Sequence, residues 1–526
     1  MASFFSAGLT LFELVAAYSC GVLSWDNTSR KTACLFLGLF ILQWLGYKLY
    51  SVFIYPFYVS PLRRIPGPTG GHLFFGQFIN LFRAETPIST YNEWKRQFPD
   101  EPIIRYLTLG NNEVIIPLTA EAQKYVLQTR CYDFPKPLWW QKMVRGFLGL
   151  GIATLEGDDH KLSRKLLSSS FALSNIRKLQ PAFQKKAQQM CVFLDEAIAS
   201  SDDGTGVVDV GDLLRKATLD VMGTTTLGTE LSDLQDTHEG GNKARYNFCE
   251  AYDMILSEKT MSVLLMFANP YVPGGLRWLP LQANRDFLFA SSWVRKTLTN
   301  LVRERYRKIS NLKMNGKYRK DESSDLLTFI VEESGPGGVA EGIPEEHLVG
   351  HLLQFMAAGH ETSATTIAYA LLAMAENHAI QDTVRAEIEK LYLRSENPTS
   401  TEIDGLPYLE NFVKECLPTT THRESRVDMV FENTAIPAGT TFDIIPAMTL
   451  LDKGVWGSDV NEFDPTRWDR LSEEQLFAML EMKVFLVELV RHHCFLKLEG
   501  SYSVPVPGLT MRPTNMRIRL EKIASK

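Results

Sequence analysis

The chain has 526 residues, of which 45% are hydrophobic and 22% are charged, and its formal net charge is −6. This length suits two or three domains or one large helical unit. The slightly acidic balance argues against a nucleic-acid partner, which would call for a concentrated basic face. The seven cysteines are odd in number and lack CxxC spacing, which indicates a reducing compartment without a disulfide framework.

An apolar segment at residues 33–55 predicts a transmembrane anchor. It contains only three clearly polar residues and four aromatic residues that suit a membrane interface. About 20 apolar residues are enough to span the hydrocarbon layer. Residues 1–32 precede the anchor and include a weaker apolar stretch at 4–23, which suits either a second span or an interfacial helix. Arg63 and Arg64 follow the anchor, so the remainder is expected in the cytosol.

A proline-rich hinge is predicted at residues 56–70. Pro66 and Pro68 surround a glycine, and this arrangement cannot continue a helix. The chain is therefore expected to turn stiffly away from the membrane. Residues 71–526 are then predicted to form one folded domain.

Several elements are expected before the middle of the chain. Residues 103–118 alternate around a Gly-Asn-Asn turn, which predicts a β-hairpin with positive φ at the turn. A helix is expected at 119–128. Residues 131–157 are predicted to be a long irregular segment, and segments of this length are usually functional. Residues 175–308 are typical of a series of amphipathic helices.

The longest uninterrupted pattern, residues 346–377, predicts a buried helix. It is apolar or small on nearly every face and exceeds the ~11–12 residue average. Near its middle, Gly359 removes bulk, and the Thr362 hydroxyl can bond to the carbonyl one turn earlier. Together with Glu361 these residues suit a groove for a large, flat group. From this stretch alone, a tight crossing with another helix is favoured, with Glu361 paired elsewhere.

A second pair of polar residues lies on an earlier predicted helix. His160 and Arg164 are four residues apart, so both side chains can point at the same anion. Lys161 and Lys165 accompany them, which leaves an exposed basic face as the alternative.

The run Ala358-Gly359-His360-Glu361-Thr362-Ser363 resembles, at each specified position, the signature of the long central helix in the cytochrome P450 family. Other landmarks follow in the family's order from about residue 66 to residue 520. The resemblance implies a mainly α fold with small β-sheets (α+β). It also implies a haem-thiolate monooxygenase that receives electrons from NADPH-cytochrome P450 reductase and oxidises an apolar small molecule. The hinge and anchor resemble fungal members, which suggests secondary metabolite biosynthesis at the endoplasmic reticulum membrane.

The resemblance assigns roles to eight residues: proton delivery by Glu361 and Thr362, contact with haem b by His160, Arg164, Gly359 and Arg423, and a structural ion pair between Glu415 and Arg467.

Two motifs depart from the family pattern. The Arg of Glu-x-x-Arg is absent after Glu415, where Pro418 follows instead. The loop expected to carry the haem-binding cysteine is reduced to residues 469–475, and counting back from Phe477 places Ser472 at the cysteine position. A helix that begins near Phe477 is expected to continue to residue 498. A serine hydroxyl cannot act as a thiolate ligand, so no residue of this chain is predicted to bind the metal.

These departures leave two hypotheses. The first is a membrane-anchored P450 monooxygenase, which the family favours for the gene. The second is a non-catalytic, haem-free P450-like protein, produced by a deletion, a splice form or a defective gene model. The missing cysteine favours the second for the chain as written.

Overall fold

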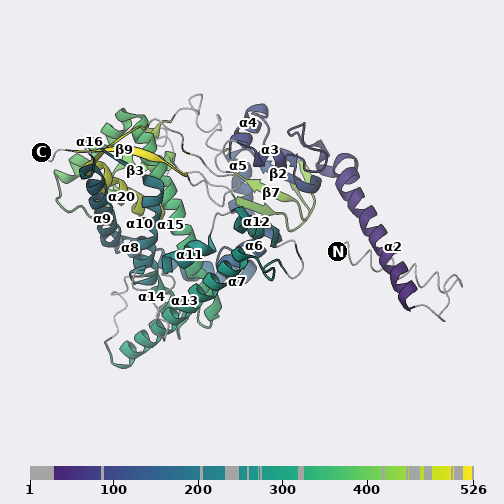
Figure 1. The fold of residues 1–526 in the computed structure, drawn as a ribbon, viewed down its shortest axis with the longest axis horizontal. Helices are drawn as coiled ribbons and strands as arrows, with labels where there is room; N and C mark the ends of the chain where they lie inside the picture. The colour runs from purple at the N-terminus through teal and green to yellow at the C-terminus, as the bar shows by residue number, and fades with distance from the viewer. Residues whose placement is uncertain are drawn as a thin grey trace. The chain divides into compact units, whose positions relative to one another are not determined.

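The structure, a computed structural model, describes residues 29–84, 88–201, 205–231, 248–256, 260–269, 272, 275–317, 325–416, 421–445, 448, 463–466, 477–498, 502 and 513–523. Its contacts divide the chain into two compact units. Unit 1 comprises Met1–Ala84, Ile88–Pro135 and Thr420–Val455, and unit 2 comprises Glu85–Pro87, Lys136–Thr419 and Trp456–Lys526. The described residues are mainly helical with small β-sheets, which confirms the expected fold class (Figure 1).

The N-terminal part of unit 1 begins with α2 (Ser29–Leu49) and continues without interruption into the π-helix η2 (Tyr50–Val59). The predicted anchor at 33–55 is thus divided between an α-helix and a wider helix that contains Pro56. Within the described part of the chain, no helix has both the length and the apolar character needed to cross a membrane.

Unit 1 is built around a four-stranded sheet in the order β1-β2-β7-β4. The strands are β1 (Ile103–Leu107), β2 (Glu113–Pro117), β4 (Thr421–Glu424) and β7 (Thr441–Ile444). β1 and β2 pair antiparallel, with Ile103 opposite Pro117, and Gly110 and Asn111 have φ of 69° and 52° in the turn. The hairpin predicted at 103–118 is therefore confirmed.

Shorter elements complete unit 1: η3 (Pro61–Arg64), α3 (Phe78–Phe82), α4 (Ser89–Gln97), η4 (Leu109–Asn111), α5 (Ala120–Lys124), η5 (Tyr125–Thr129), η6 (Cys131–Asp133) and the hairpin β5 (Met429–Phe431) and β6 (Thr434–Ile436). The helix predicted at 119–128 is present as α5 followed by η5. Thr119 caps its start by accepting a hydrogen bond from the Ala122 amide.

Unit 2 is largely helical. Its helices are α6 (Leu138–Leu148), α7 (Gly157–Ser170), α8 (Leu173–Arg177), α9 (Gln180–Ala199), α10 (Val210–Met222), η7 (Gly223–Leu227), α11 (Phe248–Ile255), α12 (Thr260–Ala268), α13 (Gln282–Met314), α14 (Leu326–Ser334), α15 (Glu345–Glu376), α16 (His378–Tyr392), α17 (Ser400–Asp404), α18 (Pro407–Glu415) and α20 (Phe477–His492). An antiparallel sheet in the order β3-β9-β8 joins β3 (Thr205–Asp209), β8 (His493–Leu496) and β9 (Arg517–Lys522).

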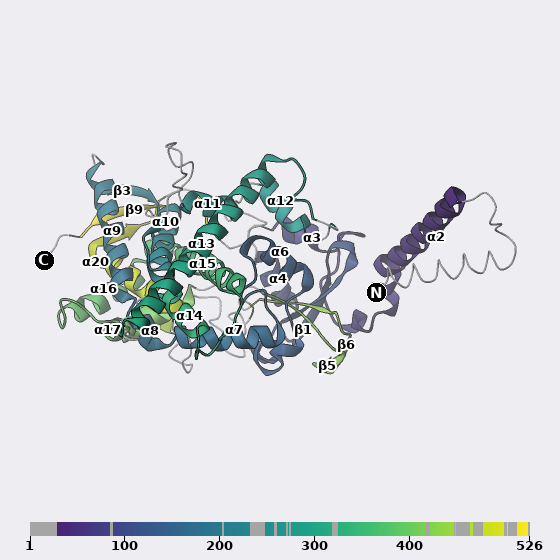
Figure 2. The same cartoon turned by 90° about the horizontal axis from the view of Figure 1, so that it is seen from below.

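Helix α15 connects the two hydrophobic cores of unit 2. Its first half, from Leu348 to Met356, packs with α6, α7, α11, α13 and α14. Its second half, from Ala364 to Ala375, packs with α9, α10, α16, α18 and α20. Figures 1 and 2 show α10 running beside α15. The helix predicted at 346–377 is confirmed, since Pro344 immediately precedes it and Asn377 ends it.

Two sequence predictions in unit 2 were wrong. The segment at 131–157 is not wholly irregular, because α6 occupies its middle and ends at Gly149, whose φ is 80°. Four of its side chains are buried at helical spacing: Met143, Val144, Phe147 and Leu148. The helix that begins at Phe477 does not extend to residue 498, because β8 leaves it after His492 to pair with β9.

Candidate functional site

The middle of α15, between the two cores, has an exposed spot. Ala358 and Thr362 are exposed and lie one turn apart, although most of the helix is buried. The Thr362 hydroxyl donates to the Ala358 carbonyl at 2.5 Å, which is the hydrogen bond expected from the sequence. A threonine that bonds back in this way weakens the helix ladder and favours a local opening.

Two further hydroxyls reach the same part of the helix backbone. Thr366 donates to the Thr362 carbonyl at 2.9 Å, and Thr218 of α10 donates to the His360 carbonyl at 2.9 Å. The carbonyls of Ala358, His360 and Thr362 thus each accept a side-chain hydroxyl. This segment has an unusual concentration of side-chain hydrogen bonds to its backbone.

Gly359 and His360 fix the neighbouring helices against this segment. A Cβ on Gly359 would lie 2.4 Å from the Met222 sulfur, so the glycine permits the close approach of α10. The His360 ring is buried, with Nδ1 2.7 Å from the Met356 carbonyl, and it makes a T-shaped contact with the ring of Tyr252. The tight helix crossing considered from the sequence is therefore present at Gly359.

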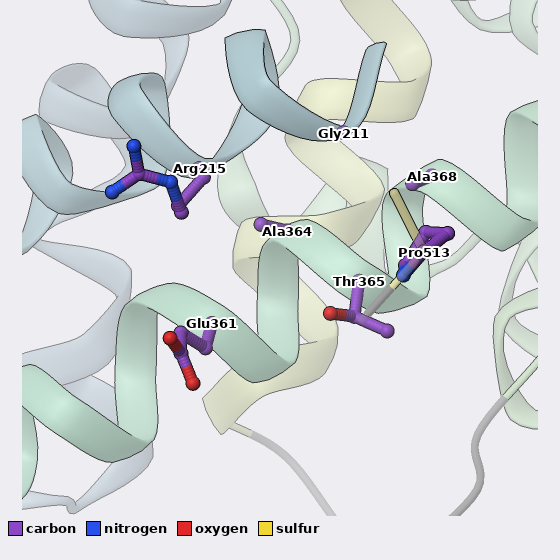
Figure 3. A pocket seen from close by; sticks show the side chains of 7 residues that line it. All are labelled: Gly211, Arg215, Glu361, Ala364, Thr365, Ala368 and Pro513. Carbon is purple, nitrogen blue, oxygen red and sulfur yellow. The ribbon is translucent and has the colours of Figure 1, made fainter. Parts of the chain in front are cut away.

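Glu361 is buried on another side of α15 from Thr362, since adjacent helical residues point about 100° apart. It lines a small pocket with Arg215 and Gly211 of α10, Ala364, Thr365 and Ala368 of α15, and Pro513. Figure 3 shows Glu361 and Arg215 toward one end of this pocket, and Thr365 and Pro513 toward the other. Arg215 also pairs with Asp253 at 2.6 Å. The Glu361 carboxyl and the Thr362 hydroxyl therefore lie on different sides of α15, in different surroundings.

Ser363 joins α15 to α20. Its hydroxyl donates to Glu481 Oε2 at 2.7 Å, and Glu481 is only 1% exposed. Burial raises the pKa of Glu481 to about 7, although the bond from Ser363 acts in the opposite direction. Within the described residues, Glu481 Oε1 has no hydrogen-bond partner. Glu481 is not among the site residues predicted from the sequence, although a carboxylate within the apolar run of α20 is a signal that could have identified it.

The remaining predicted cofactor residues lie in both units. His160 and Arg164 lie one turn apart on α7 in unit 2, where His160 is half-buried and Arg164 is exposed. Arg423 lies on β4 in unit 1, is half-buried, and donates to the His422 carbonyl at 2.8 Å. The adjacent His422 ring contacts Asp443 at 2.6 Å. The shared anion contact of His160 and Arg164 and the separate haem contact of Arg423 remain predictions.

Of the predicted ion pair between Glu415 and Arg467, only Glu415 lies within the described residues. Glu415 is half-buried at the end of α18, less buried than expected, and its Oε1 accepts the Asp464 amide at 3.4 Å. Arg467 lies outside the described residues, as do Ser472 and the whole segment 469–475. The pair of Glu415 and Arg467 therefore remains a prediction.

Four of the described cysteines do not suit a thiolate ligand for haem. Burial raises the pKa of Cys191 to about 12 and that of Cys249 to about 11, and it also raises the pKa of Cys416 and Cys494. Such thiols stay protonated at neutral pH. Over the described ranges, no three His, Cys, Asp or Glu side chains are grouped to hold a metal ion. Since the sequence at 469–475 contains no cysteine, the residues present do not fit a thiolate-held haem.

Comparisons with known proteins agree with the signature on α15. The family model for Cytochrome P450 matches residues 65–475. Cytochrome P450 monooxygenase sphH of Aspergillus fumigatus is 28% identical over 437 residues, which cover 80% of this chain and 76% of the relative. FUM15 of Gibberella moniliformis is 28% identical over 81% of this chain and 72% of its own length. Cytochrome P450 monooxygenase buaD of Petromyces alliaceus is 24% identical over 88% of this chain and 82% of its own length.

Proposed function

Because this chain belongs to the cytochrome P450 family, we propose that its substrate is an apolar small molecule of secondary metabolite biosynthesis. The family makes the protein an oxidoreductase of the monooxygenase type. The observation that carries the proposal is the exposed spot at Ala358 and Thr362 on a helix that is otherwise buried. It presents one hydroxyl and two methyl groups and no charge, which suits an apolar substrate.

We assign proton handling to Glu361 and Thr362. Glu361 lines the pocket beside Arg215, while the Thr362 hydroxyl lies at the exposed spot. General acid–base catalysis needs each group within hydrogen-bond reach of the proton that it moves, so Glu361 and Thr362 would each handle protons on their own side of the helix. The comparisons favour this enzymatic interpretation over the haem-free alternative, because the relatives are named monooxygenases.

Cofactor contact is assigned to His160, Arg164 and Arg423, which would hold the carboxylates of haem b, and to the backbone of Gly359, since Met222 of α10 fills the side on which a Cβ would lie. Arginine forms strong, charge-assisted bonds to carboxylates, and Arg164 is exposed on α7. The cysteine that the family places in the loop at 469–475 is absent from the sequence, so no catalytic step is assigned through the haem.

Membrane attachment at the endoplasmic reticulum is assigned to residues 33–55, with NADPH-cytochrome P450 reductase as the electron donor. Several apolar side chains of α2 and η2 are exposed, including Leu42 at 66% and Tyr58 at 70%. Large exposed apolar surfaces are typical of membrane or protein contact, and their position near the N-terminus supports an anchor there.

The proposed function can be tested on a repaired chain. A family loop with the pattern Phe-x-x-Gly-x-Arg-x-Cys-x-Gly is inserted before Phe477, and an Arg is inserted after Leu417. The repaired protein is expected to show the carbon monoxide absorbance band of thiolate-held haem and to oxidise apolar substrates with NADPH and reductase.

Two variants of the repaired chain then test the proton residues. Thr362→Ala is expected to consume NADPH while forming less product, and Thr366→Ala is the matched control, because it also bonds to a helix carbonyl but is buried. If Thr362→Ala forms as much product per NADPH as the parent, the role of Thr362 is wrong.

A further inference from the structure

The connection between α6 and α7 is unusually buried for a loop. Gly149, Gly151, Thr154 and Leu155 are all buried in it. Loops usually lie at the surface, because buried backbone groups must find hydrogen-bond partners. Some partners come from the loop itself, since the Thr154 hydroxyl donates to the Gly149 carbonyl at 3.0 Å and accepts the Gly151 amide at 3.1 Å.

Two side chains of α15 provide the other partners. The Ile152 amide donates to His351 Nδ1 at 3.1 Å, and the Ala153 amide donates to Gln354 Oε1 at 2.7 Å. Gln354 Nε2 in turn donates to the Gly149 carbonyl at 3.1 Å. His351 and Gln354 thus bind consecutive backbone groups of the loop much as a neighbouring strand would.

Glycines make this contact sterically feasible. A Cβ on Gly350 of α15 would lie 1.7 Å from the Leu150 carbonyl oxygen, and one on Gly151 would lie 2.6 Å from Gln354 Oε1. No side chain fits at either position without moving the backbone, so the loop rests directly on the helix.

The chemical state of His351 agrees with its contact. The ring is 0% exposed, and burial, followed by the nearby charge of His347, lowers its pKa to about 4. It is therefore neutral near pH 7, as required for Nδ1 to accept a hydrogen bond. Within the described residues, its Nε2 has no partner. A ring placed only for core stability would not leave a buried donor unpaired, so the bond to the loop is its evident role.

We propose that His351 and Gln354 are positioning residues, which hold residues 149–155 on α15 and thereby fix the first turn of α7. The Leu155 amide donates back to the Gly151 carbonyl at 2.9 Å, so the held segment reaches almost to Gly157, where α7 begins. His160 lies in that first turn. The expected contact of His160 with an anion depends on the proposed function. The placement of His160 by the loop does not depend on it.

Hydrogen exchange measured by mass spectrometry on the full-length, detergent-solubilised protein tests this directly. Gln354→Leu and His351→Phe remove the two acceptors while keeping similar volume. The Ala153 and Ile152 amides, respectively, are expected to exchange roughly five- to tenfold faster, as for the loss of one net hydrogen bond. The amides of residues 158–163 in the first turn of α7 are expected to exchange faster as well.

Conservative variants and a control separate positioning from general damage. His351→Asn keeps an acceptor at about the same place and is expected to restore most of the protection at Ile152. Gln354→Glu keeps the acceptor for the Ala153 amide but loses the donor to the Gly149 carbonyl, so it is expected to restore only part of the protection. His347→Phe, one turn earlier on α15, is the matched control and should leave both segments unchanged.

Three results would overturn the proposal. The first is unchanged exchange at residues 149–155 in both Gln354→Leu and His351→Phe. The second is faster exchange in the loop without any change in α7. The third is equally faster exchange throughout α13 and α15, which would indicate general destabilisation. None of them depends on catalysis, so each is distinguishable from failure of the proposed function.

Discussion

Replacing Glu481 by Gln should remove a pH-dependent destabilisation of unit 2. Glu481 is buried on α20 with one oxygen bonded to Ser363, and burial raises its pKa from 4.5 to about 7. Below pH 4.5 this carboxyl is protonated in both the folded and the unfolded chain. As the pH rises toward 7, the unfolded chain releases the proton first, so the folded state becomes progressively less stable.

The size of the effect follows from the two pKa values. Each pH unit between them lowers the free energy of unfolding by about 1.4 kcal/mol. The destabilisation is therefore slightly under ~1 kcal/mol at pH 5 and roughly 3 kcal/mol at pH 8.5. Glu481→Gln stays neutral at every pH and retains an oxygen for Ser363. We expect the free energy of unfolding of this variant, relative to the parent, to rise by about 2.5 kcal/mol between pH 5 and pH 8.5.

Urea unfolding followed by tryptophan fluorescence at the two pH values provides the assay. The exposed Glu389→Gln on α16 is the control, and its difference from the parent should hardly change with pH. If Glu481→Gln and the parent lose the same stability between pH 5 and pH 8.5, the carboxyl is ionised in the fold at both values and the reasoning is wrong.

Three further predictions concern other parts of the chain. For the His422 and Asp443 pair, burial opposes both charges but their mutual attraction outweighs it, which raises the pKa of His422 and lowers that of Asp443. The pair stabilises the fold fully between pH 3.8 and pH 6.5, and this stabilisation is lost as the pH rises through the folded-state pKa of His422. The variant His422→Gln should therefore lower the urea midpoint more at pH 6 than at pH 9. Equal losses at the two pH values would contradict this. The unrepaired protein, reduced under carbon monoxide, should show no thiolate-haem band, because residues 469–475 lack a cysteine; a clear band would mean that another cysteine reaches the iron. Deleting residues 1–60 should move the protein from the membrane fraction to the supernatant, and full-length protein that is already soluble without detergent would exclude the anchor.

Features that depend on neighbouring residues could be predicted from the sequence. The limits of α15 follow from Pro344, Asn377 and the apolar run between them. The bond from Thr362 to Ala358 spans one turn, so it needs only the helix itself. The hairpin of β1 and β2 was likewise determined by its local Gly-Asn-Asn turn.

Features that depend on distant residues could not be predicted in this way. Helix α6 is short, contains Gly146 and lies between Pro137 and Gly149, so its local signals favour a loop. It is stabilised by packing into the core with α13 and α15. The bond from Ser363 to Glu481 and that from Ile152 to His351 join residues more than 100 positions apart. A single sequence carries no periodic pattern that would reveal such pairs.

The three-stranded sheet of unit 2 has a consequence for how the protein is made. Its middle strand β9 comes from the last residues of the chain, whereas β3 is about 300 residues earlier. At roughly 5–20 residues per second, a ribosome needs about 15–60 s to make the intervening chain. During that time β3 lacks its partner strand, and the core beneath α9 remains open on that side. Unit 2 is therefore completed only after β9 has been synthesised, and a nascent or prematurely terminated chain that lacks β9 exposes an unpaired strand edge to chaperones and proteases.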